Sequence, residues 1–203
     1  MIRVYIFLFL TLISGIVFGQ ESKGFRVYTN VFQNIDLSHP RINIGIEKDV
    51  RVSQSLSFGI GYYYYDWITK TPSSGLNINI EYKRIRPSNI YYALGINVEK
   101  LRYVSEHSYN LLNDTVRYSE SFHIDKVIGD LYVKLGYRTQ IGNHFYFDIF
   151  GGLGMRIKKT QHFDRNYPFL RQGKEPNIPD IRDKEGQFLS PIIKLGLIVG
   201  IKI

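Results

Sequence analysis

The sequence has no cysteine among its 203 residues. Disulfide bonds and thiolate metal sites are therefore excluded, and stability has to come from packing and backbone pairing. Beyond the N-terminal segment, no apolar run approaches the roughly 20 residues that a transmembrane helix needs. Basic residues outnumber acidic residues by 26 to 18, but they form no run of Lys and Arg. Without such a basic patch, we predict no nucleic-acid partner.

Residues 1–19 have the pattern of a secretory signal peptide. Arg3 gives a short positive start, an apolar stretch follows over 4–17, and small or permissive residues stand three and one positions before Gln20. The apolar stretch is too short to anchor the chain in a membrane as a helix. We predict cleavage immediately before Gln20 and a mature barrel domain of residues 20–203.

The clearest structural signal is a hairpin pattern in the second half of the chain. Apolar and polar residues alternate along 127–141 and again along 145–158. Alternation with a period of two is typical of a strand with one apolar face. Residues 142–144, Gly-Asn-His, accept the backbone angles of a short hairpin turn. Keeping both apolar sets on one face requires an odd number of loop residues, so Ile141 should lie opposite Phe145.

This register also places opposite charges side by side. Arg138 should face Asp148, and Asp130 should face Arg156, across the two strands. Oppositely charged cross-strand neighbours stabilise a sheet. Two explanations are open: the pairs are a coincidence on a solvated face, or they belong to an interior with matched charges. We favour the matched interior, because hydrophobicity alone sets the register that produces both pairs.

The same alternation recurs along the mature chain. We predict eight strands, at residues 26–35, 41–48, 55–67, 75–85, 90–104, 127–141, 145–158 and 190–203. Every second connection is a short turn, and the others lengthen along the chain, at residues 36–40, 68–74, 105–125 and 159–188. Bacterial outer-membrane barrels have short periplasmic turns and longer external loops. The pattern predicts an all-β fold, an eight-stranded antiparallel up-and-down transmembrane β-barrel with both termini on the periplasmic side.

Alternation alone does not say whether the apolar face lines a soluble, calycin-like barrel or points outward into lipid. Glycine is frequent on the polar face, where it makes room for large neighbours inside a narrow eight-stranded barrel. These glycines are Gly45, Gly59, Gly61, Gly95, Gly136, Gly152, Gly154, Gly196 and Gly200. Aromatic residues gather at strand ends, as in the girdles at the two membrane interfaces. Both features favour lipid on the outside.

The cost of placing charge in lipid separates the two orientations. A basic residue on the lipid face costs about 2–4 kcal/mol at the bilayer midplane. With the barrel turned inside out, five charged residues would meet lipid at a cost on the order of 10 kcal/mol: Asp130, Lys134, Arg138, Asp148 and Arg156. The charged face is therefore expected inside, where side chains fill the narrow lumen. We expect a salt-bridged plug there rather than a channel.

Four segments carry a resemblance to a known family: residues 41–48, 56–62, 147–154 and 190–196. The chain resembles the small eight-stranded outer-membrane barrels, and it is similar in layout to the transmembrane domain of outer membrane protein A. It looks more closely like outer-membrane barrel proteins common in Bacteroidota. The resemblance implies export to the cell outer membrane, insertion by the barrel-assembly machinery and contact with outer-membrane lipid. It implies no particular activity.

Few residues suggest catalysis. Ser121 and His123 lie close together in the expected loop 105–125, and a barrel-embedded lipid hydrolase would need a serine activated by a histidine. Ordinary polar loop composition accounts for the same residues. The five histidines fall in expected loops or turns without metal-ligand spacing on one element: His39, His107, His123, His144 and His162. We therefore predict no enzyme activity, no cofactor and no metal.

The two longest expected loops are the remaining candidates for function. Residues 105–125 are mainly acidic, and residues 159–188 carry six basic and five acidic side chains. Loops of this length are usually functional or disordered, so they either form a docking surface or are solvated and mobile. We predict a structural or surface-recognition role, with an extracellular ligand or surface partner bound through these loops. Two alternatives stay open: a lipid hydrolase in the barrel, and a periplasmic soluble barrel that binds an apolar ligand.

Overall fold

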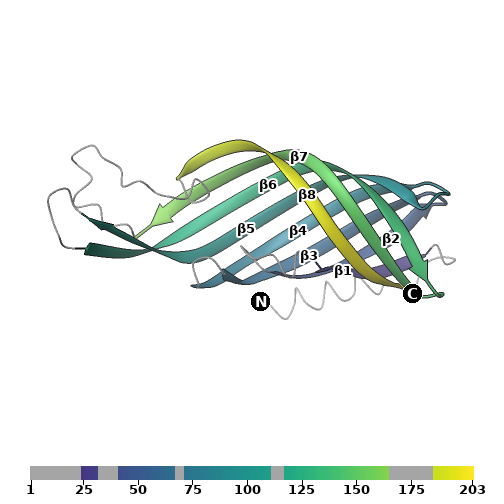
Figure 1. Cartoon of the computed structure of the whole chain (residues 1–203), viewed down its shortest axis with the longest axis horizontal. Helices are drawn as coiled ribbons and strands as arrows, with labels where there is room; N and C mark the ends of the chain where they lie inside the picture. The colour runs from purple at the N-terminus through teal and green to yellow at the C-terminus, as the bar shows by residue number, and fades with distance from the viewer. Residues whose placement is uncertain (1–23, 32–40, 67–70, 111–116, 165–184) are drawn as a thin grey trace, which may run out of the picture.

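The structure, a computed structural model, is a closed barrel of eight antiparallel strands (Figure 1). It describes residues 24–31, 41–66, 71–110, 117–164 and 185–203. Each strand pairs with the next along the chain, and β1 pairs with β8 to close the sheet. The predicted fold class is therefore confirmed. The strands are β1 (Phe25–Asn30), β2 (Arg41–Arg51), β3 (Gln54–Asp66), β4 (Thr71–Ile85), β5 (Ile90–Asn110), β6 (Arg117–Ile141), β7 (Phe145–Phe163) and β8 (Gly186–Lys202).

Several sequence predictions lie outside the described residues. They are the signal peptide at residues 1–19, the part of the first predicted strand beyond residue 31, the predicted loop 36–40, and parts of the predicted loops 68–74, 105–125 and 159–188. Within the described part of the chain, no helix has the length and apolar character to cross a membrane.

Three short turns lie together at one end of the barrel, which we call the turn end. They join β2 to β3, β4 to β5 and β6 to β7, as the sequence predicted. Across the third turn Ile141 lies opposite Phe145, and Gly142 adopts a φ of 64°, which glycine reaches without steric cost. The end of β8 also lies here, because the amide of Lys202 donates a hydrogen bond to the carbonyl of His144 (2.6 Å). We call the opposite end the loop end.

At the loop end, the prediction of a loop over residues 105–125 is wrong for most of its length. β5 continues to Asn110, β6 begins at Arg117, and the two strands stay paired throughout. β7 likewise continues to Phe163, into the predicted loop 159–188. Figure 1 shows β5 and β6 projecting at this end beyond the other strands. We call this projecting part the extension. The prediction failed because it required an apolar outward face, and that face becomes polar in the extension.

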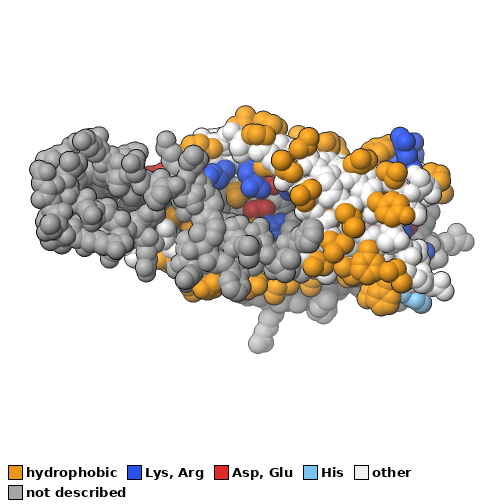
Figure 2. Space-filling view, viewed as in Figure 1, with side chains coloured by type: hydrophobic (Ala, Val, Ile, Leu, Met, Phe, Trp, Pro, Cys, Tyr) orange, Lys and Arg blue, Asp and Glu red, His pale blue; other side chains and the backbone are white. Residues whose placement is uncertain are grey.

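An apolar belt surrounds the barrel between its two ends. On β6 the odd-numbered residues from Val127 to Tyr137 point outward, and Leu131, Val133 and Leu135 are 54–63 % exposed. The even-numbered residues between them are buried. Figure 2 shows hydrophobic side chains over much of the visible wall of the barrel. The apolar face recognised in the sequence is thus the outer face.

The polarity of the two faces reverses in the extension. Outward positions of β5 and β6 carry charge there, including Arg102 and Asp125, which face each other across the two strands. Inward positions carry a buried apolar group that we call the loop-end cluster, made of Tyr63, Leu101, Tyr103, Phe122 and Ile124. The polarity of the outward face changes at the same height on β5, β6 and β7. At this height the outward Lys100 of β5 and Lys159 of β7 lie on either side of Val127 of β6. The apolar belt therefore ends at a sharp boundary.

Inside the barrel, large aromatic rings lie over glycines of neighbouring strands. The ring of Tyr132 covers Gly95, and the ring of Tyr91 covers Gly136. A Cβ atom on Gly95 would lie 2.5 Å from the Tyr132 ring. The same arrangement joins Tyr28 to Gly45, Phe150 to Gly196 and Tyr146 to Gly200. Glycine on the inward face thus lets these rings lie close against the wall.

Candidate functional site

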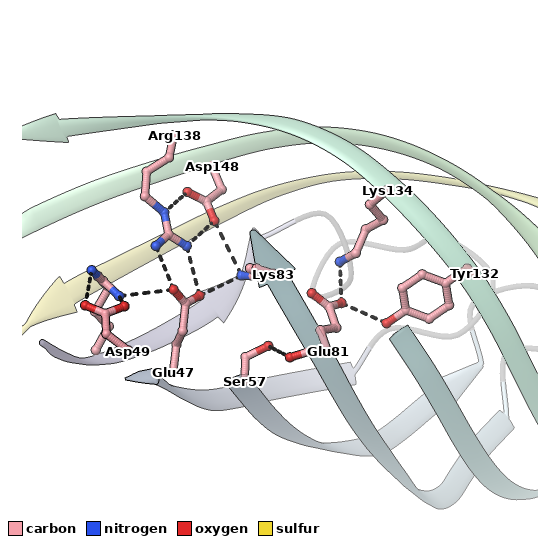
Figure 3. A network of polar contacts seen from close by, with 10 residues as sticks. Glu47, Asp49, Ser57, Glu81, Lys83, Tyr132, Lys134, Arg138 and Asp148 are labelled. Atoms are coloured by element: carbon pink, nitrogen blue, oxygen red, sulfur yellow. Dashed lines mark hydrogen bonds and ion pairs between the residues drawn. The ribbon is translucent and has the colours of Figure 1, made fainter. Parts of the chain in front are cut away.

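Charged side chains inside the barrel form groups of ion pairs. The group at the turn end includes Glu47, Lys83, Arg138 and Asp148, and we call these four residues the turn-end network (Figure 3). Arg26 also contacts Glu47, at 3.2 Å. Arg138 donates from Nε and Nη2 to the two oxygens of Asp148, at 2.7 and 2.8 Å. It also donates from Nη1 and Nη2 to the two oxygens of Glu47, at 2.6 and 2.9 Å. Nζ of Lys83 lies 2.7 Å from Glu47 and 3.6 Å from Asp148.

The side chains of the turn-end network are buried inside the barrel. Its four side chains are at most 9 % exposed. Aromatic rings pack around them: Nζ of Lys83 lies 5.5 Å from the ring centroids of Tyr28 and Tyr91, and the guanidinium of Arg138 lies 4.6 Å from that of Tyr146. Buried charges are tolerated only when they are paired and hydrogen-bonded. The network therefore balances most of its own charge inside the barrel.

A second group lies midway along the barrel around Asp130. Arg156 donates from Nε and Nη2 to the two oxygens of Asp130, at 2.7 and 3.0 Å. Nζ of Lys194 lies 2.9 Å from the same carboxylate. One negative charge is thus shared by two cations.

Glu81 holds a further group inside the barrel (Figure 3). Its carboxylate pairs with Lys134 and accepts a hydrogen bond from the hydroxyl of Tyr132 (2.7 Å). Nζ of Lys134 lies 3.9 Å from the ring centroid of Phe150, a distance typical of a cation–π contact. Aromatic rings and carboxylates together hold this cation away from water.

Glu99 is the centre of the group nearest the loop end. It accepts hydrogen bonds from Nη1 of Arg41 (2.8 Å), the hydroxyl of Tyr63 (2.6 Å) and Nδ2 of Asn97 (2.6 Å). Sequence reasoning missed Arg41 as an inward charge. The signal was present, because Arg41 has the same parity along β2 as the inward Glu47.

The structure brings the four predicted site residues together in the predicted partnerships. Arg138 lies opposite Asp148, and Asp130 lies opposite Arg156, on β6 and β7. Ten charged residues on the polar faces of the strands point inward and are buried or half-buried: Glu47, Glu81, Lys83, Glu99, Asp130, Lys134, Arg138, Asp148, Arg156 and Lys194. Sequence reasoning missed the contact of Arg138 with Glu47, because strand register identifies only neighbours on adjacent strands.

A cavity of about 460 Å³ occupies the middle of the barrel. Among the described residues that line it, six are basic and two are acidic: Arg41, Lys126, Lys134, Arg156, Lys158, Lys194, Glu81 and Glu99. The outward side chains of Ile44, Ile193 and Leu195 also line the cavity. Figure 2 shows basic and acidic side chains in a hollow of the wall beside β8.

The outward face of the extension has polar contacts of its own. Nε and Nη2 of Arg102 donate to the carboxylate of Asp125, and these hydrogen bonds lower the pKa of the Asp125 carboxyl below its ordinary value. Nδ1 of His123 lies 3.1 Å from Oδ2 of Asp164. Ser121 lies two residues from His123 and is also exposed. Both residues belong to β6, which corrects their predicted position in a loop.

The predicted placement of the histidines in loops is wrong for three of them. His107 lies in β5, His123 in β6 and His162 in β7, while His144 lies in the predicted turn. His39 lies outside the described residues. In the part of the chain that the structure describes, no three potential metal ligands come together.

Solved structures similar to this chain include two outer-membrane proteins. One is the N-terminal β-barrel domain of Pseudomonas aeruginosa OprF, with 8 % identity and a TM-score of 0.36, over 91 % of this chain and 100 % of that chain. Another is a major outer membrane protein from Thermus thermophilus, with 11 % identity and a TM-score of 0.35, over 89 % of this chain and 98 % of that chain. No protein-family model and no curated protein matches the sequence.

Proposed function

We propose that this chain is an integral outer-membrane β-barrel with a structural or surface-recognition role carried by its extension. The reversal of polarity at the level of Lys100, Val127 and Lys159 carries the proposal. On the turn-end side of this level, apolar side chains face outward and charges face inward. On the loop-end side, outward positions carry charge and the inward loop-end cluster is apolar. A barrel wholly in water does not need an apolar outward face, and a barrel wholly in lipid does not tolerate outward charges.

The apolar belt has the height of a bilayer core. On β6 it runs over eleven residues, from Val127 to Tyr137, and a tilted transmembrane strand needs about 9–11 residues. A closed barrel also satisfies its backbone hydrogen bonds without water, as lipid requires. Outer-membrane lipid is the proposed partner of the belt, and the barrel-assembly machinery is the proposed route of insertion.

The alternative of a periplasmic soluble barrel with an apolar ligand fits these side chains poorly. Such a barrel needs an apolar interior, whereas the lumen holds Asp130, Lys134 and Arg138, each at most 8 % exposed. It would also leave the whole belt in water. Exposed apolar surfaces of this extent mark sites of contact with lipid or protein.

The extension supports recognition outside the cell. Paired strands and the loop-end cluster hold it in one conformation beyond the belt. Its outward face is polar, which suits a surface in contact with water. The extracellular ligand or surface partner is proposed to bind here, through residues 105–125 and 159–188. Residues 111–116 and 165–184 of these segments lie outside the described residues.

The lack of native cysteine makes the topology directly testable. Ser121→Cys should react with a membrane-impermeant maleimide on intact cells, because this position lies in the extension. Asn143→Cys, in the third turn, should react only after the outer membrane is opened. The unsubstituted protein is the control and should remain unlabelled. Equal labelling of the two variants on intact cells would count against the proposal, as would labelling of Asn143→Cys alone.

One observation favours a second function, a lipid hydrolase on the outer face. Asp164 contacts Nδ1 of His123 (3.1 Å), which would leave Nε2 as a general base toward Ser121. A nucleophile, a base and an orienting carboxylate are the parts of a serine hydrolase. If the site is catalytic, Ser121→Ala and His123→Ala abolish fatty-acid release from phospholipid micelles, while the outward control Gln161→Ala retains it. Absence of release by the unsubstituted protein rules this function out.

A further inference from the structure

We propose that the outer wall of the barrel binds a phosphate-bearing lipid where the apolar belt ends, with the phosphate between Lys100 and Lys159 and an acyl chain over Gly129. The proposal rests on the belt facing lipid, and it adds the class of lipid and its position. Lys100 of β5 and Lys159 of β7 both lie directly across from Val127 of β6, and all three point outward. Neighbouring strands are about 4.8 Å apart, so the two lysine backbones are about 10 Å apart. Both ammonium groups can therefore reach one phosphate over Val127.

The first argument is charge. Among the described residues, neither Lys100 nor Lys159 makes a hydrogen bond or an ion pair. Asp125, the next outward residue of β6 on the loop-end side, already accepts hydrogen bonds from Nε and Nη2 of Arg102. At these two levels the outward positions of β4 to β7 thus carry three cations and one carboxylate. An anion between the two lysines would gain two charge partners without displacing an existing ion pair.

The second argument is the height of the two lysines. On the belt side, the next outward residues of β5 and β7 are Val98 and Ile157, which are 51 % and 52 % exposed. The headgroup region of a bilayer lies directly outside its hydrocarbon core. A lipid whose chains lie along the belt therefore places its phosphate at the level of Lys100 and Lys159. A phosphate also accepts several charge-assisted hydrogen bonds at once, which suits two ammonium groups.

The third argument is a notch in the belt directly below this level. Gly129 occupies an outward position of β6 between Val98 and Ile157, and a Cβ atom there would have nothing within 4 Å. Along β6 the notch is bordered by the outward Val127 and Leu131, which are 47 % and 54 % exposed. An acyl chain can lie closer to the wall here than over the neighbouring side chains. The notch is apolar and adjoins the lysines, so the structure favours a lipid over a free phosphate ion.

The test is native mass spectrometry of the folded protein from a neutral detergent. The protein is titrated with phosphatidic acid or with a diacylglycerol that has the same chains, and the dissociation constant of the first bound lipid is measured. The unsubstituted protein should bind phosphatidic acid more tightly, because only this lipid carries a phosphate. A basic residue near an anionic lipid surface contributes about 1 kcal/mol, so Lys100→Gln and Lys159→Gln should each weaken binding about fivefold.

Lys48→Gln is the matched control, because Lys48 is an outward lysine of β2 at the turn end. It should leave the affinity unchanged. Gly129→Leu fills the notch and should weaken binding of phosphatidic acid with both lysines in place. Equal affinity of the unsubstituted protein for the two lipids overturns the proposal, and so does an equal loss in Lys48→Gln. Unchanged affinity in Gly129→Leu rejects the placement of the chain.

The titration is independent of which end of the barrel faces outside the cell. A protein that passes the cysteine-labelling test of topology but does not prefer the phosphate-bearing lipid lacks this site, and the proposed function stands. Failure of the labelling test would instead count against the proposed function itself. The two failures are therefore distinguishable.

Discussion

Arg138 and Glu47 are 91 residues apart in the sequence, yet Nη1 of Arg138 lies 2.6 Å from Oε1 of Glu47 in the lumen. Their strands, β6 and β2, are four steps apart in either direction around the closed sheet. The contact therefore joins opposite walls of the barrel. Lys83 of β4 and Asp148 of β7 take part in the same network, so four strands share one buried group of charges.

Replacing Arg138 with leucine should weaken the barrel markedly. The substitution removes four hydrogen bonds and leaves the carboxylates of Glu47 and Asp148 short of one cation. Breaking a buried ion pair by removing one partner costs about 3–5 kcal/mol. We expect the folded, heat-modifiable band on unboiled gels to disappear at a clearly lower temperature. Arg102→Leu removes an exposed ion pair and should change that temperature little. An unchanged mobility shift in Arg138→Leu would argue against the network.

Alanine at Gly95 should destabilise the barrel, whereas alanine at Gly129 should not. A Cβ atom on Gly95 would lie 2.5 Å from the ring of Tyr132, whose hydroxyl binds Glu81 (2.7 Å). Moving that ring disturbs packing and hydrogen bonding together, and overpacking of this kind costs about 1–3 kcal/mol. A Cβ atom on Gly129 would have nothing within 4 Å. Urea midpoints of unfolding, followed by circular dichroism in detergent, check this prediction. Equal midpoints for the two variants would contradict it.

A charge in the middle of the belt should impair insertion into lipid. Val133→Lys places an ammonium at an outward position that is 58 % exposed, at a cost of about 2–4 kcal/mol near the bilayer midplane. Ser121→Lys places the same group on the same face of β6 beyond the belt, where water is available. The measurement is the urea dependence of folding into phospholipid vesicles, and only Val133→Lys should shift it. If the two variants insert equally well, the belt does not face lipid.

The parts of this structure that the sequence predicted depend on neighbours along the chain or across one turn. The alternation along 127–141 and 145–158 identified β6 and β7, because side chains of a strand point to opposite faces in turn. A three-residue turn fixed their register. Arg138–Asp148 followed from that register without further information.

The parts that the sequence did not predict depend on surroundings that change along one strand. The sequence predicts a loop at residues 105–125 because outward residues there, such as His123 and Asp125, are polar where the belt residues are apolar. Alternation continues there with the faces exchanged. The contact of Arg138 with Glu47 was missed for another reason. It depends on barrel closure and on the length of an arginine side chain, and neither is encoded in the pairing of adjacent strands.

A nitroxide scan along β6 tests the orientation of the barrel most directly. Single cysteines from Ser121 to Tyr137 would be spin-labelled in lipid vesicles, and the collision of each label with oxygen and with a water-soluble nickel chelate would be measured. Outward labels from Val127 to Leu135 should meet oxygen and exclude nickel, and outward labels from Ser121 to Asp125 should meet nickel. A label at Val133 that is shielded from both reagents, or that meets nickel freely, would contradict the account.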